Sequence, residues 1–572
     1  MLRTMKRSWR NAGLFLFALA LLGGTLFGNR ILALDDEARE DLRLYTELVS
    51  VAQERYGTEV AYRDLVYASI QGMLRSLDPH TSFLPPRAYS GMRERQQASF
   101  YGLGILVGMR NGQLTVITPI EGTPASQVGM RAGDVISLIE GVPTETMTVD
   151  EAVDKLKGPK GTKVHVTIVR RGMPEPIEME VTRAEIPQNS VRLSYLLRDD
   201  VGYIQISDFN RSTGEEVARA LKDLKAAGME RLVLDLRNNG GGLLDQAILV
   251  SDQFLPDGAK IVETRGRTRD SFQVFRSTDR YEELGMPVVV LVNRGTASAA
   301  EIVSGAIQDH DVGVVVGEPT WGKGLVQTVY NLSYGAGLAL TTAKYYTPSG
   351  RLIQRDYTSF YDYYNYDPLA AGGDEAEAPE GVEGEPEIER GDVYYTDTGR
   401  KVYGGGGITP DVEVELVEIP EFAQYLLARN AFFDFAVEMN NRNPVDDPAW
   451  QPPADLLKRF EEWLVREEVA DAAQIEEGFA EAAARDFARL QIHAEVFNST
   501  WGQEARHRVL TAGDAQIQEA LEQLAAAGRL LANREKLEAE GRLGRFDSAT
   551  AGAGDDEAGQ LLATPGETGD SG

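Results

Sequence analysis

Apolar runs separated by glycine turns and amphipathic segments dominate the middle of the chain. The run at residues 286–292 has the length and β-branched composition of a buried strand, and residues 298–309 after it have helical spacing. A second apolar run, at residues 312–316, follows directly. Residues 231–247 repeat the order of strand, glycine-rich turn and helix. Strands that alternate with helices predict an α/β core.

Two turns of this core carry reactive side chains. Ser298 opens a helix, where the amides of the first turn surround its hydroxyl. Lys323 lies in a glycine-bracketed turn after the strand at residues 312–316. Both turns follow the carboxyl ends of strands, where open α/β sheets place their sites. The arrangement predicts a serine nucleophile with a lysine base.

A glycine-rich turn, Gly240 to Gly242, is expected at the same edge. Glycine lets backbone N–H groups approach a reacting carbonyl oxygen, as an oxyanion hole requires. Lysine at its ordinary pKa of about 10.4 is protonated at neutral pH, so the fold must desolvate Lys323 to make it a base. The apolar strand before it and the neighbouring Trp321 can supply that burial.

Other interpretations use the same residues. Residues 317–324 are close to a phosphate-binding P-loop, but Gly324 replaces the magnesium-binding hydroxyl, and the residues that follow favour a strand over a helix. A Ser-His-Asp triad would need one of the 5 histidines. His310 is nearest in sequence, but a helix of about twelve residues places it about 18 Å from Ser298. Ser298 can also be a simple N-cap, and Lys323 a salt-bridge lysine. The convergence of serine, lysine and glycine turn on one edge favours a protease.

Several ordered segments resemble the C-terminal processing, or tail-specific, peptidases, which are PDZ-containing Ser/Lys serine proteases. They are SLDPHTSFL (76–84), YGLGILVG (101–108), LRNNGGG (236–242), GKGLVQ (322–327) and TTAKYYTPSGRLIQ (341–354). The resemblance implies a crotonase-like α/β protease core. It also implies that Ser298 is the nucleophile, Lys323 the general base and Gln327 the residue that orients the lysine. The implied oxyanion-hole donors are the amides of Ala299 and Gly241.

The chain departs from the family pattern at two places. Where the family usually has Ser-Ala-Ser-Ala-Ser, residues 296–300 are Thr-Ala-Ser-Ala-Ala, which leaves Ser298 as the single candidate nucleophile in this segment. Gly240 stands where proline is common, which gives the oxyanion turn extra backbone freedom.

Residues 98–185 alternate apolar strands around one amphipathic helix, residues 149–158. This order resembles a PDZ domain, a β-rich α+β module. By that resemblance, amides of one loop capture the carboxylate of a substrate C-terminus. The loop residues are Tyr101, Gly102, Leu103, Gly104 and Ile105. Because the loop is apolar, we expect substrates with free, apolar C-termini.

Composition limits the remaining functions. Lysine and arginine total 58 against 88 aspartate and glutamate, and the net charge of −30 argues against nucleic acid and anionic membrane surfaces as partners. The absence of cysteine excludes disulfides, thiol catalysis and thiolate metal sites. The 5 histidines show no metal-ligand spacing. We therefore expect neither a metal nor another cofactor.

The N-terminus has the layout of an export signal. Basic residues from Arg3 to Arg10 precede an apolar stretch at residues 12–28. Residues 1–34 are expected to be a signal peptide or a membrane anchor. An exported enzyme, periplasmic or otherwise extracytoplasmic, is therefore predicted.

The remaining segments complete the expected organisation. Residues 35–97 have helical spacing, and the family resemblance implies packing beside the core and dimer contacts. The core is expected at residues 186–418, with an acidic insertion at about 358–400. A helical extension for partner or self-association follows at residues 419–546, and residues 547–572 have the composition of a disordered tail.

Two functions remain open at this stage. One is an exported serine endopeptidase that recognises protein C-termini through its PDZ domain and trims or degrades exported proteins, alone, as a homo-oligomer or with an adaptor protein. The other is a catalytically silent PDZ scaffold on a protease-like fold. The intact set of Ser298, Lys323 and Gln327 favours the enzyme.

Overall fold

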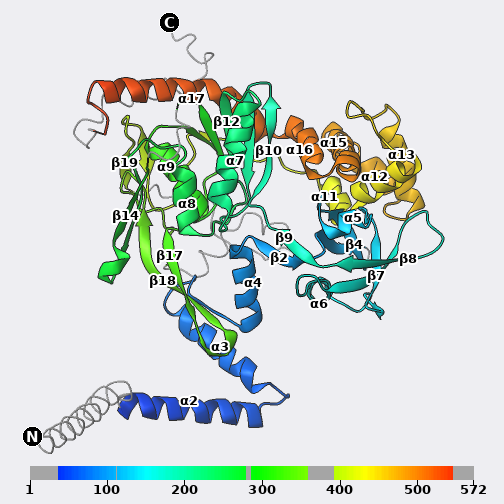
Figure 1. Ribbon diagram of the computed structural model, residues 1–572, viewed down its shortest axis with the longest axis horizontal. Coiled ribbons are helices and arrows are strands. Elements are labelled where there is room, and N and C mark those ends of the chain that lie inside the picture. Colours follow the sequence, from blue (N-terminus) through cyan, green and yellow to red (C-terminus); the bar gives the residue numbers. More distant parts are fainter. Residues whose placement is uncertain (1–35, 111, 279–284, 358–391, 545–572) are drawn as a thin grey trace, which may run out of the picture. The chain divides into compact units, whose positions relative to one another are not determined.

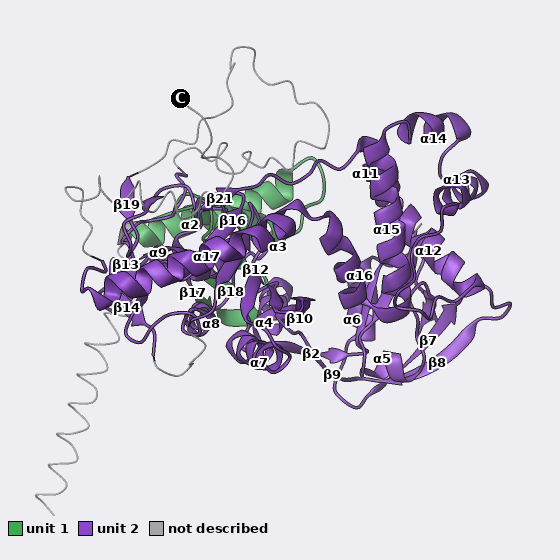
Figure 2. Cartoon of the chain, turned by 90° about the horizontal axis from the view of Figure 1, so that it is seen from above, with its two compact units in different colours: residues 1–85, 329–340 green, residues 86–328, 341–572 purple. Residues whose placement is uncertain are grey.

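The computed structural model describes residues 36–110, 112–278, 285–357 and 392–544. The chain divides into two compact units (Figure 2), one of Met1–Pro85 with Val329–Leu340 and one of Pro86–Thr328 with Thr341–Gly572. The predicted export segment, most of the acidic insertion and the predicted C-terminal tail lie outside the described residues. Within the described ranges, no helix combines the length and the apolar character needed to cross a membrane.

A six-stranded sheet forms the centre of the larger unit, in the order β10-β11-β12-β15-β16-β21. Five strands are parallel, and the edge strand β10 is antiparallel to its neighbour. The strands are β10 (Val191–Arg198), β11 (Val201–Ile206), β12 (Arg231–Asp235), β15 (Val288–Val292), β16 (Val314–Gly317) and β21 (Val412–Glu413). Every residue of β15 and β16 is buried, as parallel strands covered on both faces require. The α/β core predicted from the apolar runs is confirmed.

Alternate residues of these strands face two different cores. On one face, Leu232 and Leu234 of β12 pack in a cluster with the helices α7 (Thr213–Ala226), α8 (Leu244–Ser251) and α9 (Ala299–Asp309). On the other face, Val233 packs with α17 (Ala515–Ala539). Figure 1 shows α17 running along the sheet on the side opposite α8 and α9. The sheet is therefore sandwiched, and its second layer comes from the C-terminal extension.

The same unit holds a second sheet and the PDZ module. In the second sheet, residues 343–346 of β18 (Gly337–Tyr346) pair with β13 (Lys260–Gly266), which pairs with β14 (Gln273–Arg276); the start of β18, up to Leu340, belongs to the smaller unit. The PDZ strands are β3 (Ile105–Arg110), β4 (Gln113–Pro119), β5 (Val135–Ile139), β7 (Lys163–Val169) and β8 (Ile177–Thr182), joined in that order. The predicted amphipathic helix is α6 (Val149–Leu156). The chain enters through β2 (Ser99–Gly102) and leaves through β9 (Ala184–Pro187), which pair with each other.

Five helices after residue 420 form their own core. They are α11 (Glu421–Ala428), α12 (Ala431–Arg442), α13 (Leu456–Arg466), α14 (Ala472–Gly478) and α15 (Ala482–Trp501), and α16 (Gln503–Leu510), which has no buried residue, follows them before α17. Leu456, Phe460, Trp463 and Leu464 of α13 are buried in this core. The smaller unit contains α2 (Asp36–Arg55), α3 (Tyr62–Arg75) and β1 (Ser82–Leu84), which pairs with residues 337–339 of β18.

Candidate active site

Ser298 lies in a sharp turn between β15 and α9. Its backbone has φ 55° and ψ −113°, a conformation that costs a non-glycine residue about 1–3 kcal/mol. Two hydrogen bonds secure the preceding residues, from the Thr296 hydroxyl to the Leu236 carbonyl (2.8 Å) and from the Ala297 amide to the Asn239 carbonyl (2.9 Å). Ser298 itself is only half-buried. This strained strand-to-helix turn is the geometry that exposes a nucleophilic serine.

Glu301, one turn into α9, holds the two candidate catalytic residues together. Its fully buried carboxylate accepts hydrogen bonds from the backbone amides of Ser298 (2.7 Å), Gly322 (2.7 Å) and Lys323 (2.9 Å). Burial raises the pKa of Glu301, and these hydrogen bonds act in the opposite direction. No role was predicted for Glu301 from the sequence, although Ser-x-x-Glu at a helix start is the pattern of a capping box.

A buried hydroxyl makes a second link between the same residues. Tyr345, on β18, donates from its hydroxyl toward the carbonyls of Ser298 (3.0 Å) and Lys323 (2.6 Å). Burial raises the pKa of Tyr345 well above its ordinary value, so the phenol keeps its proton. Together, Glu301 and Tyr345 bring the serine turn and the lysine turn to one place, as the sequence analysis predicted for the two turns.

Lys323 precedes β17 (Leu325–Asn331), and its ammonium nitrogen donates to Gln327 Oε1 at 2.8 Å. These are the partners that the family resemblance implied. Lys323 is half-buried. The nearby Trp321 ring carries the Arg355 guanidinium at 5.4 Å from its centroid, so a cation lies on the aromatic side chain that was expected to desolvate the lysine.

The glycine turn approaches the serine turn closely. A Cβ on Gly241 would lie 2.7 Å from the Ser298 Cβ and 2.9 Å from the Ala299 nitrogen, so only glycine fits there. However, the Gly241 amide donates to Asn239 Oδ1 at 2.9 Å, and the Asn239 amide group donates to the Ile206 carbonyl. The amide expected to bind an oxyanion is therefore engaged in this conformation. The Ala299 amide begins α9 and has no intrahelical acceptor.

The loop of the PDZ module that is predicted to bind the substrate carboxylate is held in place by hydrogen bonds to its own carbonyl groups. The Leu103 carbonyl accepts from the Ala125 amide (3.0 Å), and the Gly104 carbonyl accepts from the Ile120 amide (2.9 Å). In a trans peptide the N–H points away from the C=O, so the amides of Gly104 and Ile105 face away from these partners. Gly104 has φ 79°, and a Cβ there would clash with Thr123, whereas Tyr101 is exposed.

The triad and P-loop interpretations do not fit this geometry. His310 lies at the far end of α9, where it contacts Asp397 (2.7 Å) and the Lys260 carbonyl (2.8 Å) rather than Ser298. The residues after Gly324 form β17 and not the helix that a P-loop requires. In the described part of the chain, no cluster of acidic and histidine residues has the arrangement to hold a metal ion.

Comparison with known proteins agrees with these observations. The family model "Peptidase family S41" matches residues 200–359, and that of the PDZ domain matches residues 115–170. The chain is 39% identical over 350 residues to a carboxy-terminal-processing protease of Bartonella bacilliformis, across 60% of this chain and 79% of the relative. It is 40% identical over 306 residues to a carboxyl-terminal-processing protease of Synechocystis, across 51% and 69%.

Among solved structures, the photosystem II D1 C-terminal processing protease is 32% identical, with a TM-score of 0.31, across 53% of this chain and 82% of that one. The extent of the Bartonella match, together with the two family models, identifies the family. The chain therefore belongs to peptidase family S41, the family of the carboxy-terminal-processing serine proteases.

Proposed function

We propose that this protein is a Ser/Lys endopeptidase that recognises the C-termini of exported proteins through its PDZ domain and trims or degrades them. The observation that carries the proposal is the double link between Ser298 and Lys323, through the Glu301 carboxylate and the Tyr345 hydroxyl. Two turns that are 25 positions apart in the chain are held as one unit, as a nucleophile and its base must be.

The chemistry follows from this pairing. Neutral Lys323 accepts the Ser298 hydroxyl proton while the serine oxygen attacks the substrate carbonyl carbon. The protonated lysine then gives the proton to the leaving amine, which breaks the peptide bond and leaves an acyl-enzyme. A water molecule repeats the sequence and releases the new C-terminus. Gln327 Oε1 orients the lysine nitrogen throughout.

Oxyanion stabilisation requires amides that face the reacting carbonyl oxygen. The Ala299 amide, at the positive end of the α9 dipole, supplies one donor. For Gly241 to supply the second, its amide must exchange Asn239 Oδ1 for the substrate oxygen. The oxyanion site is thus completed only when the glycine turn rearranges, which gives substrate binding a means to control turnover.

Recognition is assigned to the PDZ loop. The amides of Gly104 and Ile105 would bind the terminal carboxylate, while the substrate chain adds a strand beside β3. The exposed Leu106, at 52% of its full accessibility, borders that strand position and favours apolar substrate ends. The signal peptide or membrane anchor predicted within residues 1–34 supports an activity outside the cytoplasm.

The test uses protein that lacks residues 1–34, incubated with an unfolded protein substrate beside its Ser298→Ala form. We expect cleavage by the parent protein alone, and slower cleavage when the substrate C-terminus is amidated. The Gly104→Pro variant should cleave substrates with a free C-terminus as slowly as the parent protein cleaves amidated ones. Equal cleavage of free and amidated substrates would remove C-terminal recognition but keep the dyad. Absence of turnover, with intact binding of peptides, would favour the silent PDZ scaffold.

A further inference from the structure

The oxyanion turn begins at a buried ion pair at the end of β12. Arg237 donates through Nε and Nη2 to the fully buried Asp235, at 3.0 and 2.7 Å to the same carboxylate oxygen. The Arg237 amide and the Tyr203 hydroxyl complete the shell of this carboxylate, at 2.9 and 2.6 Å. Burial alone would raise the pKa of Asp235, but the guanidinium, the Tyr203 hydroxyl and the Arg237 amide together lower the pKa below its ordinary value. This end of Arg237 is therefore fixed by the core.

The other end of the same guanidinium is held by the C-terminal extension. Arg237 Nη1 donates to Asp514 Oδ1 and to Gln516 Oε1, both at 3.0 Å. Asp514 is also the N-cap of α17, since it accepts from the Ile517 amide at 3.0 Å. Gln516 is almost fully buried and is itself positioned by a hydrogen bond to the Val414 carbonyl. A cation in the core is thus shared between carboxylates from segments more than 250 positions apart.

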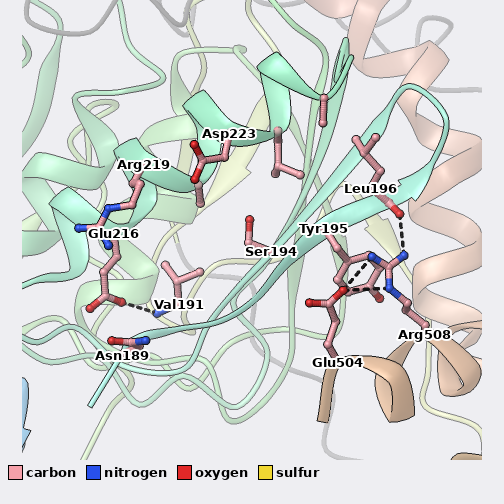
Figure 3. A pocket seen from close by; sticks show the side chains of 13 residues that line it. Asn189, Val191, Ser194, Tyr195, Leu196, Glu216, Arg219, Asp223, Glu504 and Arg508 are labelled. Carbon is pink, nitrogen blue, oxygen red and sulfur yellow. Dashed lines mark hydrogen bonds and ion pairs between the residues drawn. The ribbon is translucent and has the colours of Figure 1, made fainter. Parts of the chain in front are cut away.

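The preceding helix, α16, is attached to the core nearby. His507 contacts the hydroxyls of Tyr195 (2.9 Å) and Tyr203 (3.3 Å). Figure 3 shows the pocket beside this attachment, where Arg508 donates to the Leu196 carbonyl (3.0 Å) and lies over the Tyr195 ring. The residues that bind Arg237 therefore belong to a segment, α16 and the start of α17, that contacts the core at several places.

Arg237 is also directly continuous with the oxyanion turn. Asn238, the next residue, has φ 57° and is fixed by two hydrogen bonds with Asn293, at 2.8 and 3.0 Å. Asn239 follows and holds the Gly241 amide. Since an oxyanion donor must lie within a few tenths of an ångström of its place, a small displacement of Arg237 affects catalysis more than it affects folding.

We propose that Asp514 and Gln516 are positioning residues for proteolysis, which hold Arg237 and so set the oxyanion turn, and that docking of α17 thereby completes the active site. The inference rests on the Ser298/Lys323 activity proposed above. It predicts that a change of charge at Asp514 alters turnover, although α17 stays attached to the sheet through apolar residues such as Ile517, Leu524 and Leu530.

Asp514→Asn is the decisive variant. Asparagine keeps the N-cap of α17, because aspartate and asparagine cap helices about equally well, but it removes the charge that faces Arg237. Asp235 remains, so the guanidinium is not left unpaired in the core. Glu522→Gln is the matched control, since it makes the same change of charge at an exposed position of the same helix. The double variant Asp514→Asn/Gln516→Glu restores one carboxylate beside Arg237.

The measurements are kcat and KM for a peptide substrate, the affinity for a peptide aldehyde whose adduct with Ser298 needs the oxyanion hole, and the thermal midpoint. For Asp514→Asn we expect kcat to fall about 10- to 100-fold with little change in KM, and aldehyde affinity to fall with it. Glu522→Gln should match the parent protein, and the double variant should recover part of kcat.

The inference would be overturned if a folded Asp514→Asn variant kept the kcat of the parent protein. It would also be overturned if kcat fell in Asp514→Asn and did not rise again in the double variant. If Asp514→Asn does not fold, Gln516→Met tests the same contact with Arg237. We expect kcat of Gln516→Met to fall to a similar extent, and an unchanged kcat in this folded variant would overturn the inference. Ser298→Ala is measured in parallel. Turnover by Ser298→Ala would reject the proposed function, whereas an inactive Ser298→Ala beside a fully active Asp514→Asn would reject only the role of α17.

Discussion

The two ends of α9 differ in how their buried acidic side chains are paired. At the amino end, a strained serine and a half-buried lysine share one buried carboxylate, Glu301, which binds backbone amides rather than a cation. At the carboxyl end, each acidic side chain has a basic partner. Asp309 binds Arg351 at 2.7 Å with both side chains fully buried, and Asp311 binds Arg400 at 2.6 Å.

The difference separates reactivity from stability along one helix. The amino end carries the positive end of the helix dipole and keeps polar groups available to a substrate. At the carboxyl end, Arg400 donates to the Gln308 carbonyl (3.1 Å) and Arg534 to the His310 carbonyl (2.9 Å), so cations satisfy the last carbonyls of the helix. Changes at the amino end should therefore affect turnover, and changes at the carboxyl end should affect folding.

The largest effect is expected from the dyad. Ser298→Ala and Lys323→Ala should each abolish proteolysis, and the double variant should be no worse, because the two residues act as one unit. Lys323→Arg should also be inactive, since arginine does not give up its proton. Turnover of an unfolded protein, with contaminating proteases excluded, measures each variant. Additive losses in the double variant would show that the residues act separately.

Glu301→Gln tests the amino end without removing a catalytic side chain. One carboxylate oxygen accepts from the amides of both Ser298 and Lys323, and the other accepts from the Gly322 amide and the Thr320 hydroxyl. The glutamine side chain keeps the shape of the carboxylate, but its NH2 group must face backbone N–H donors on one of these two sides. We expect kcat to fall about 100-fold, as for a misplaced catalytic group, with a smaller change in KM. Steady-state kinetics on a chromogenic peptide provides the measurement, and an unaltered kcat would refute the positioning role.

Arg351→Met tests the carboxyl end of the same helix. It leaves the fully buried Asp309 without its guanidinium, and removing one partner of a buried pair costs about 3–5 kcal/mol of the free energy of unfolding. Urea denaturation should show this loss, while kcat per folded molecule stays near that of the parent protein. A fall in kcat comparable to that of Glu301→Gln would remove the distinction between the two ends.

The smallest effect concerns pH and the docking of α16. Burial lowers the pKa of His507 below its ordinary value of 6.5, so the folded state keeps the ring neutral where the unfolded chain is protonated. Stability from this group is complete above the unfolded pKa and is lost as pH falls from about 6.5 toward the folded pKa.

His507→Gln should flatten the decline of the thermal midpoint on that acid side. His310 provides an internal contrast, because Asp397 raises its pKa against the effect of burial. Its contribution is present at low pH and is lost as pH rises through the folded pKa. An identical pH profile for the parent protein and His507→Gln would show that His507 does not link α16 to the core by its protonation state.

The central elements of the fold could be predicted from local pattern. The apolar runs identify β12, β15 and β16, and helical spacing identifies α9. The role of α17 could not be obtained in this way. Helical periodicity shows that a segment has an apolar face, but it does not show that this face covers Val233 and its neighbours on a sheet more than 200 positions earlier.

The candidate site was likewise predicted only as far as local sequence pattern allows. The serine, the lysine and the glycine turn were identified from spacing, and the contact between Lys323 and Gln327 has the partners that the family resemblance implied. Glu301 was missed because two of its three amide partners come from a turn that approaches only in the folded chain. The engagement of the Gly241 amide depends on the conformation of Asn239, which the order of residues does not specify.

The position of α17 also bears on when the protein can become active. Residues 515–539 are translated after every other element of the core, and until they emerge one face of the central sheet has no cover. A growing chain that already contains Ser298 and Lys323 thus lacks the helix that completes its core. On the role proposed above for α17, the active site is complete only after residues 515–539 have been synthesised.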